Sequence, residues 1–168
     1  MRFWERFWTK IRFLWHSTNA HGVHSPFVYD WLTIGMKKQP SEPKFDKHLR
    51  VLYRNVRYFN PTKIGVLGSK PFRLRLPLDS TKMKVYDFSV REIFDLIIVE
   101  NIANHSEFEV LLTAMHEHSV LLIQEIASNV VNDCMADERI HVSIDCMYWK
   151  LFFKRPHQVK EHFILRIN

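Results

Sequence analysis

Two polar residues stand where a parallel α/β sheet places its ligands. Glu100 and Asn101 come directly after residues 96–99, an uninterrupted apolar run that is entered through Asp95. In open α/β sheets ligands bind beyond the carboxyl ends of the strands, so a carboxylate and an amide at this point are candidates for a binding site. The alternative is a solvated loop carboxylate, because loops after strands are commonly polar.

The apolar run predicts a strand that is buried on both faces. An unbroken stretch rich in β-branched residues needs cover above and below, which is how parallel sheets in α/β domains are built. Residues 63–67 and 120–126 predict two more strands of this kind. Pairing strands, some of them antiparallel, are expected towards the C-terminus at residues 140–146, 149–154 and 161–167.

Length and composition favour a single α/β domain. The 168 residues suit one core, and the formal charge of +6 favours acidic partners such as nucleic acid or anionic lipid. Cys134 and Cys146 show no metal-type spacing, so we expect two packed thiols in a reducing, cytoplasmic compartment. No apolar run approaches the roughly 20 residues of a membrane span, which predicts a protein that is soluble or at most peripheral to a membrane.

The first residues predict an amphipathic helix with an aromatic face. Residues 3–15 place Phe, Trp, Ile and Leu at helical spacing, with Arg and Lys between them. We expect this face to dock on the domain or on a second copy, and a membrane interface is the alternative. Ser25 and Pro26 predict the start of the next helix. His21 and His24 lack a Cys or acidic partner, so we expect them to bind no metal.

Both ends of the chain resemble a known family. The segment His-Gly-Val-His-Ser-Pro-Phe-Val-Tyr-Asp, residues 21–30, resembles the N-terminal signature of bacterial class I S-adenosylmethionine-dependent methyltransferase-like proteins of the type found in Bacteroidetes. Residues 142–145, 151–153 and 160–166 are similar to the closing strands of that family in order and spacing. The resemblance implies a Rossmann-like methyltransferase sheet, mostly parallel with antiparallel C-terminal edge strands.

The same resemblance assigns cofactor-binding candidates. In the family, a glycine-rich loop after the first strand approaches the methionine part of the cofactor, and Gly68 and Ser69 match its beginning. Glu100 and Asn101 match a second loop, and Glu125 would lie at the methyl-transfer end. No residue is assigned a catalytic role. His105 matches a loop histidine that could act as a base, although a helix-entry histidine without function is the simpler interpretation.

The chain also departs from the family around this site. Val66 stands where the family has an acid, and Lys70-Pro71-Phe72 replaces small residues of the loop. Residues 127–128 are Ala and Ser where the family has His and Trp. Residues 69–82 show no good amphipathic helix, because Pro71 and Pro77 interrupt them and residues 73–76 alternate like a short strand.

One connection between predicted strands is shorter than the fold of this family requires. Residues 83–88 predict a strand that ends near Asp87, the place of a ribose-binding acid in the family, yet only residues 89–93 separate it from the central strand. A parallel crossover normally needs a dozen or more residues. The sheet is therefore reduced in the middle, with the Asp87 strand either antiparallel to its neighbour or part of a rebuilt segment.

Two further helices complete the sequence-based prediction. Residues 45–59 predict a helix with an apolar stripe and a basic stripe that includes Arg50, Arg54 and Arg57, expected as a solvated face or as a phosphate contact. Ser106 and Glu109 predict a capping box. We divide the chain into N-terminal helices, residues 1–60, packed on a reduced Rossmann-like domain, residues 61–168, in one compact unit.

Three functions follow from this pattern. The first is a methyltransferase-like protein with a degenerate cofactor site, non-catalytic and without cofactor, that binds a protein partner or self-associates through residues 3–15. The second is an active S-adenosylmethionine-dependent methyltransferase that uses Gly68, Ser69, Glu100, Asn101 and Glu125. The third is a basic protein that binds nucleic acid or an anionic membrane surface. The sequence does not identify a methyl acceptor.

Overall fold

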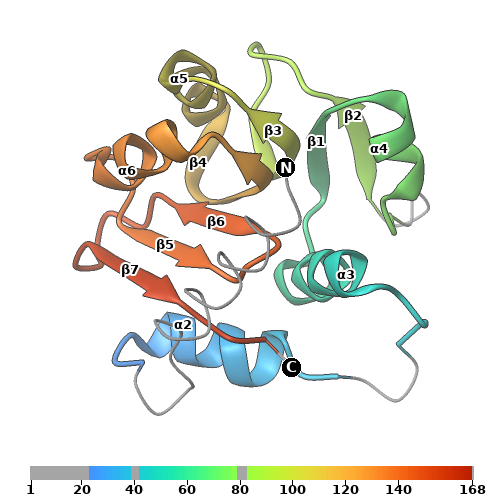
Figure 1. Cartoon of the computed structure of the whole chain (residues 1–168), viewed down its shortest axis with the longest axis horizontal. Helices are drawn as coiled ribbons and strands as arrows, with labels where there is room; N and C mark the ends of the chain where they lie inside the picture. Colours follow the sequence, from blue (N-terminus) through green and yellow to red (C-terminus); the bar gives the residue numbers. More distant parts are fainter. Residues whose placement is uncertain (1–22, 39–41, 79–82, 168) are drawn as a thin grey trace.

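The computed structural model describes residues 23–38, 42–78 and 83–167. Helices cover both faces of a seven-stranded sheet with the order β2-β1-β3-β4-β6-β5-β7 (Figure 1). The strands are β1 (Lys63–Leu67), β2 (Lys84–Asp87), β3 (Phe94–Ile102), β4 (Met115–Ile126), β5 (Val142–Asp145), β6 (Lys150–Phe153) and β7 (Glu161–Ile164). The helices are α2 (Pro26–Asp30), the π-helical turn η2 (Trp31–Gly35), α3 (Lys47–Phe59), α4 (Lys70–Arg75), α5 (His105–Thr113) and α6 (Ser128–Ala136).

The sheet is mostly parallel, which confirms the predicted Rossmann-like fold class. The pairs β1–β2, β1–β3, β3–β4 and β5–β7 are parallel, and β6 runs antiparallel to both β4 and β5. The antiparallel strand β6 therefore lies inside the sheet, between β4 and β5. The edge strand β7 is parallel to its neighbour β5. The strand order reverses between β1 and β3, because the chain passes from β1 to β2 and returns on the other side of β1.

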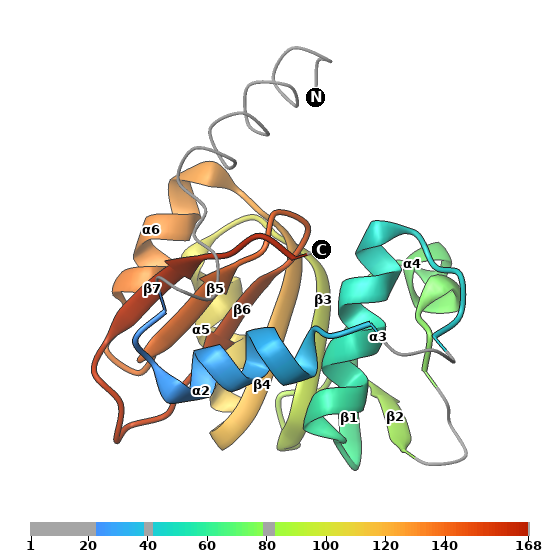
Figure 2. The same ribbon diagram turned by 90° about the horizontal axis from the view of Figure 1, so that it is seen from below.

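Two apolar cores lie on opposite faces of the sheet. Leu96 and Ile98 of β3 belong to the core beneath α2, α3 and α4, whereas Ile97 and Val99 belong to the core beneath α5 and α6. The central strand is thus buried on both faces, as its sequence predicts. Figure 2 shows α2 and α3 lying together against one side of the strands. No helix in the described ranges is long and apolar enough to cross a membrane.

The helices before the sheet begin and end close to where the sequence predicts. Ser25 accepts a hydrogen bond from Val28 N–H, and Pro26 opens α2. Trp31 is fully buried, and its Nε1 donates to Asn55 Oδ1 of α3 over 2.8 Å. Asn60 ends α3 in the left-handed conformation, with φ of 45°. Residues 3–15 lie outside the described residues, so their aromatic helix stays a prediction.

The basic stripe of α3 is not a solvated face at Arg54. The guanidinium of Arg54 is 1% exposed, binds both carboxylate oxygens of Glu42 over 2.9 and 3.1 Å, and donates to Met36 O over 2.6 Å. Arg57 donates to the carbonyl oxygens of Gly35 and Lys37. These arginines attach the segment before α3 to the helix, a role that the charge pattern alone does not distinguish from solvation.

The prediction of no helix after β1 is wrong. Residues Lys70–Arg75 form α4, and Ser69 is its N-cap, accepting a hydrogen bond from Phe72 N–H over 3.3 Å. Pro71 lies in the first turn, where a missing N–H costs nothing, so it starts the helix rather than interrupting it.

The short connection from β2 to β3 passes across β1 without a helix. β2, the strand that ends at Asp87, is parallel to β1. The antiparallel alternative is therefore wrong, and the alternative of a rebuilt segment is correct. Gly65 makes the crossing compact, because a Cβ there would lie 3.1 Å from the ring of Phe94. The ring of Phe88 packs 5.9 Å from that of Phe94. Two aromatic rings thus cover part of the sheet that a crossover helix would cover.

The predicted capping box of α5 is wrong by two residues. Asn104 is the N-cap and accepts from Glu107 N–H over 3.0 Å, while Glu107 accepts from Ala103 N–H over 2.8 Å. Ser106 and Glu109 both lie inside the helix. The two cysteines are free and buried, as predicted.

Candidate functional site

The five cofactor-binding candidates lie at the carboxyl ends of β1, β3 and β4. Gly68 and Ser69 follow β1, Glu100 and Asn101 are among the last three residues of β3, and Glu125 is near the end of β4. The strand order reverses between β1 and β3, and that is the position where open α/β sheets bind ligands. The sheet therefore brings these residues to one edge, although it does not bring all five into contact.

Glu100 is bonded to the loop that the resemblance assigns to the cofactor. Its Oε2 accepts from Ser69 N–H over 2.7 Å, and its Oε1 accepts from the Ser69 hydroxyl over 3.1 Å. The same hydroxyl caps α4. Both carboxylate oxygens are thus used to close the end of β3 onto the start of α4, which fixes the loop in one conformation.

The space beside Gly68 is filled by an aromatic ring. A Cβ at Gly68 would lie 2.5 Å from Cδ1 of Phe72 and 3.0 Å from Cβ of Glu100. Phe72 is only 3% exposed and packs against Trp149, with 6.4 Å between ring centroids. The loop glycine therefore permits a close approach, but the approaching group is a side chain of the protein's own core.

Asp87 is also paired within the chain. Its carboxylate forms an ion pair with Arg73, and the Arg73 Nε donates to Gly68 O over 3.0 Å. Arg73 thereby connects the end of β2 to the loop after β1. The acid at the expected ribose position is thus bound by a guanidinium, while 79% of its side chain stays exposed.

Asn101 and Glu125 form a second, exposed part of the site. They are register partners on β3 and β4, and both are exposed. They can reach a ligand that lies against the edge of the sheet. Neighbouring side chains of a strand point to opposite faces of the sheet. Asn101 therefore lies on the face opposite to Glu100 and its contact with Ser69.

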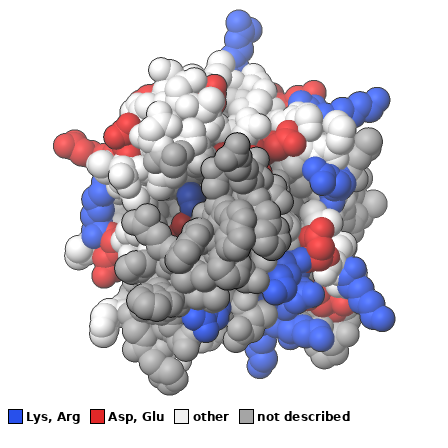
Figure 3. Space-filling view, in the orientation of Figure 1, with Lys and Arg blue, Asp and Glu red and all other residues white. Residues whose placement is uncertain are grey.

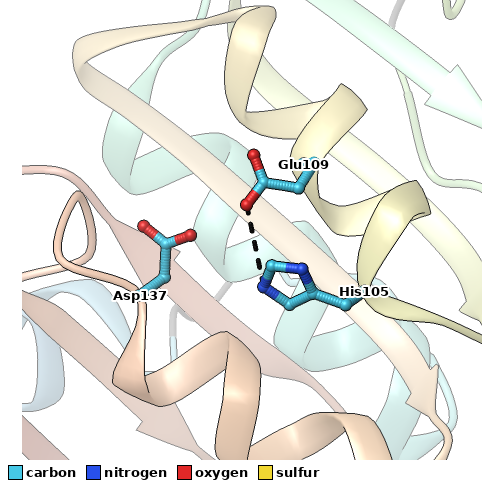
Figure 4. Close-up of side chains that lie close together, drawn as sticks. All are labelled: His105, Glu109 and Asp137. Atoms are coloured by element: carbon cyan, nitrogen blue, oxygen red, sulfur yellow. Dashed lines mark ion pairs between the residues drawn. The ribbon is translucent and has the colours of Figure 1, made fainter.

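A separate polar cluster lies between α5 and the end of α6 (Figure 4). His105, Glu109 and Asp137 each offer one ligand atom, and these atoms lie within 4.8 Å of one another. Arg139 already binds both carboxylates, with 2.5 Å to Glu109 and 2.6 Å to Asp137. The hydrogen bond from Arg139 lowers the pKa of Asp137. The guanidinium supplies the positive charge that a metal ion would supply, and His105 is part of this ion-pair network.

The sequence-based interpretation named Phe72 as part of a bulky replacement in the loop, but it missed Arg73 and the placement of both residues on a helix. Both stand on α4, the helix that it did not predict. The available signal was the combination of Ser69 with Pro71, a cap followed by a first-turn proline. With the helix assigned, Phe72 falls one turn from Gly68 and next to the buried face.

Comparison with known proteins gives one distant structural similarity. No protein-family model matches the chain, and no curated protein matches it. The chain is similar to the crystal structure of a ribosomal protein L11 methylase from Lactobacillus delbrueckii subsp. bulgaricus, at 12% sequence identity and a TM-score of 0.36, over 68% of this chain and 89% of that one. The Bacteroidetes-type family stays a prediction, and the description of the fold rests on the sheet of this chain.

Proposed function

We propose that this chain is a methyltransferase-like protein that has lost its cofactor site and acts by binding a partner. The observation that supports the proposal is the Phe72 ring beside Gly68, at 2.5 Å from the position of a Cβ. A cofactor that approached Gly68 on the side where a Cβ would lie would have to displace the ring from the core. Exposing a buried Phe side chain costs about 1.5 to 3 kcal/mol, which a ligand would have to offset before it gained any affinity.

The charges at the same edge support the proposal. Glu100 is bonded by Ser69, and Asp87 is bonded by Arg73. Both acids therefore already accept hydrogen bonds from the chain, Glu100 with its two oxygens and the exposed Asp87 with one. S-adenosylmethionine does not fit these residues in this conformation, and we assign them a structural role at the switch point of the sheet.

The alternative is an active S-adenosylmethionine-dependent methyltransferase. It is favoured by Asn101 and Glu125, which are exposed side by side at the carboxyl ends of β3 and β4 and remain accessible to a ligand. In this alternative Gly68, Ser69 and Glu100 contact the cofactor after Phe72 has moved. The methyl acceptor would lie near Glu125.

A second alternative uses the basic surface around α3. Figure 3 shows Lys and Arg side chains gathered over α3 and the segment that leads into it. Exposed lysines at 37, 38, 44 and 47 can contact phosphates, whereas Arg54 is buried. Binding to nucleic acid or to anionic vesicles that falls steeply with salt would support this alternative.

The proposal is tested by calorimetric titration of the full chain with S-adenosylmethionine and S-adenosylhomocysteine. Wild-type protein should give no binding heat and no thermal stabilisation at millimolar ligand. The Phe72→Ala variant opens the space at Gly68, and the Asn101→Ala variant changes only the exposed side of the edge. Micromolar binding by the wild type that is lost in Gly68→Arg would overturn the proposal, provided that circular dichroism shows the variant folded.

Partner binding through self-association has its own test. Light scattering on the full chain gives the mass in solution, and replacing the three tryptophans of residues 3–15 with glutamine removes the largest side chains of the predicted aromatic face. A dimeric mass that falls to the monomer in this variant supports self-association. If both the wild type and the variant are monomers, self-association is excluded and the partner must be a different protein.

A further inference from the structure

A hollow lies at the opposite edge of the sheet from the candidate site. It has a volume of about 80 Å³ and is lined by Glu117, His118, Arg155, Pro156, His157 and Gln158. The first two residues stand near the start of β4, and the other four form the turn between β6 and β7. Since one water takes up roughly 30 Å³ in the liquid, the hollow has room for a few waters or one small anion.

Arg155 supplies the positive charge of the hollow. Its guanidinium stacks on the ring of Phe27, with 3.5 Å between Cζ and the ring centroid. Its Nε is buried and has no hydrogen-bond partner among the described residues. Burial lowers the pKa of Arg155 because the charged group is partly removed from water. A guanidinium in this state gains more from an added hydrogen-bond acceptor than one that is fully hydrated.

The turn that carries Arg155 holds it in an unusual conformation. Its φ is 26°, in the left-handed region that a non-glycine residue rarely adopts. Gln158 N–H donates to Arg155 O over 3.0 Å and closes the turn. Gln158 Oε1 is buried without a partner in the described part of the chain. A side-chain amide can present its NH₂ group in place of its oxygen after a half-turn about the last bond, which would offer a second donor at this position.

The chemistry of the lining favours an anion over a metal ion. His157 can donate a hydrogen bond. Glu117 is the acid of the lining, and its side chain is 54% exposed and paired with His118 at 3.3 Å. Within the described residues, the group of side chains close enough to hold a metal is the one at His105, not this one. With Glu117 and His118 paired to each other, Arg155 and His157 remain as donors of the lining.

We propose that this hollow binds a phosphate group, either free phosphate or the phosphate of a small organic molecule. The Arg155 guanidinium is the central donor, and His157 and the Gln158 amide complete the set. The site is separate from the carboxyl edge of the sheet and does not depend on the presence or absence of a cofactor there. Because the site is partly open and has one guanidinium, we expect it to bind phosphate with a dissociation constant in the millimolar range.

Nuclear magnetic resonance of the full chain tests the proposal directly. The Arg155 Nε–H and the rings of His118 and His157 are followed during titration with inorganic phosphate and, separately, with glycerol phosphate. Ionic strength is held constant with chloride, which removes general screening effects. We expect a saturable downfield shift of the Arg155 Nε–H signal. Saturation with either ligand supports the site, and the comparison of the two tells whether an organic group adds affinity.

Two variants control for folding and for charge. Arg155→Gln should weaken phosphate binding by about tenfold or more, the effect of losing one charge-assisted hydrogen bond. Gln158→Ala leaves the stack on Phe27 in place and should weaken binding less. The matched control Arg75→Gln removes an exposed arginine of α4 and should change nothing. A shift that does not saturate, or equal binding by Arg155→Gln with an otherwise unchanged spectrum, would overturn the proposal.

Discussion

Asp95 connects the amino ends of β1 and β3, and its replacement by Asn should cost stability only when the wild-type carboxylate is ionised. Its Oδ2 accepts from Thr62 N–H, Thr62 Oγ1 and Lys63 N–H over 2.9, 2.6 and 2.9 Å. Its Oδ1 lies 3.2 Å from Nε2 of His116. Burial raises the pKa of Asp95, but these hydrogen bonds outweigh burial and lower the pKa from 3.8 to about 2.

The size of the effect follows from that pKa. A shift of about 1.8 pH units corresponds to about 2.4 kcal/mol of preference for the charged form in the folded state. The Asp95 side chain is 37% exposed, so solvent screening reduces the expected contribution to about 1 kcal/mol. Because the folded-state pKa is lowered, this stability is complete above the unfolded-state pKa and is lost as the pH falls towards 2.

Urea unfolding, followed by circular dichroism, measures the effect in the wild type and in Asp95→Asn. The difference in unfolding free energy should be about 1 kcal/mol at pH 6 and about half of that at pH 3. The control variant Asp133→Asn changes an exposed carboxylate and should show little difference at either pH. A difference between wild type and Asp95→Asn that is the same at pH 3 and pH 6 would show that the charge of Asp95 does not stabilise the fold.

Three further predictions concern the core. Gly68→Ala should destabilise the fold by about 1 to 3 kcal/mol in thermal unfolding, because its Cβ meets the ring of Phe72, and adding Phe72→Leu should restore part of the loss. Arg54→Ala should cost about 3 to 5 kcal/mol in urea unfolding, since it removes the cation bound by both oxygens of Glu42, and less in the double variant with Glu42→Ala. Both cysteines should react with a disulfide reagent only on unfolding, because burial raises the pKa of each thiol to about 12; rapid reaction of the folded protein at pH 8 would contradict this.

The strands could be predicted from the sequence because their patterns are strong. The apolar runs of β3 and β4 need cover on both faces, and each lies in the middle of the sheet with a core on either side. The absence of a crossover helix between β2 and β3 could also be predicted, because five or six residues are too few to form a helix and lead back to the sheet. The direction of β2 could not, because the parallel crossover from β1 to β2 passes through α4, the helix that was not predicted.

The helix α4 and the role of Arg54 show where sequence patterns are ambiguous. A proline in the first turn of a helix and a proline that breaks a helix look the same until the cap is considered. A basic residue on a helix is usually solvated, and only the fold brings Glu42 to Arg54. The contact of Glu100 with Ser69 joins residues 31 positions apart, so the sequence could place both at one edge but could not show that they bond to each other.

The loop after β1 is closed by the chain's own side chains, and the amide of Ser69 reports on this closure directly. This N–H donates to Glu100 Oε2 over 2.7 Å, so a ligand that enters the loop must change its environment. In a titration with S-adenosylhomocysteine to millimolar concentration, the Gly68 and Ser69 amide signals in a ¹H–¹⁵N spectrum should stay in place. Saturable shifts of these two signals at micromolar ligand would contradict the account.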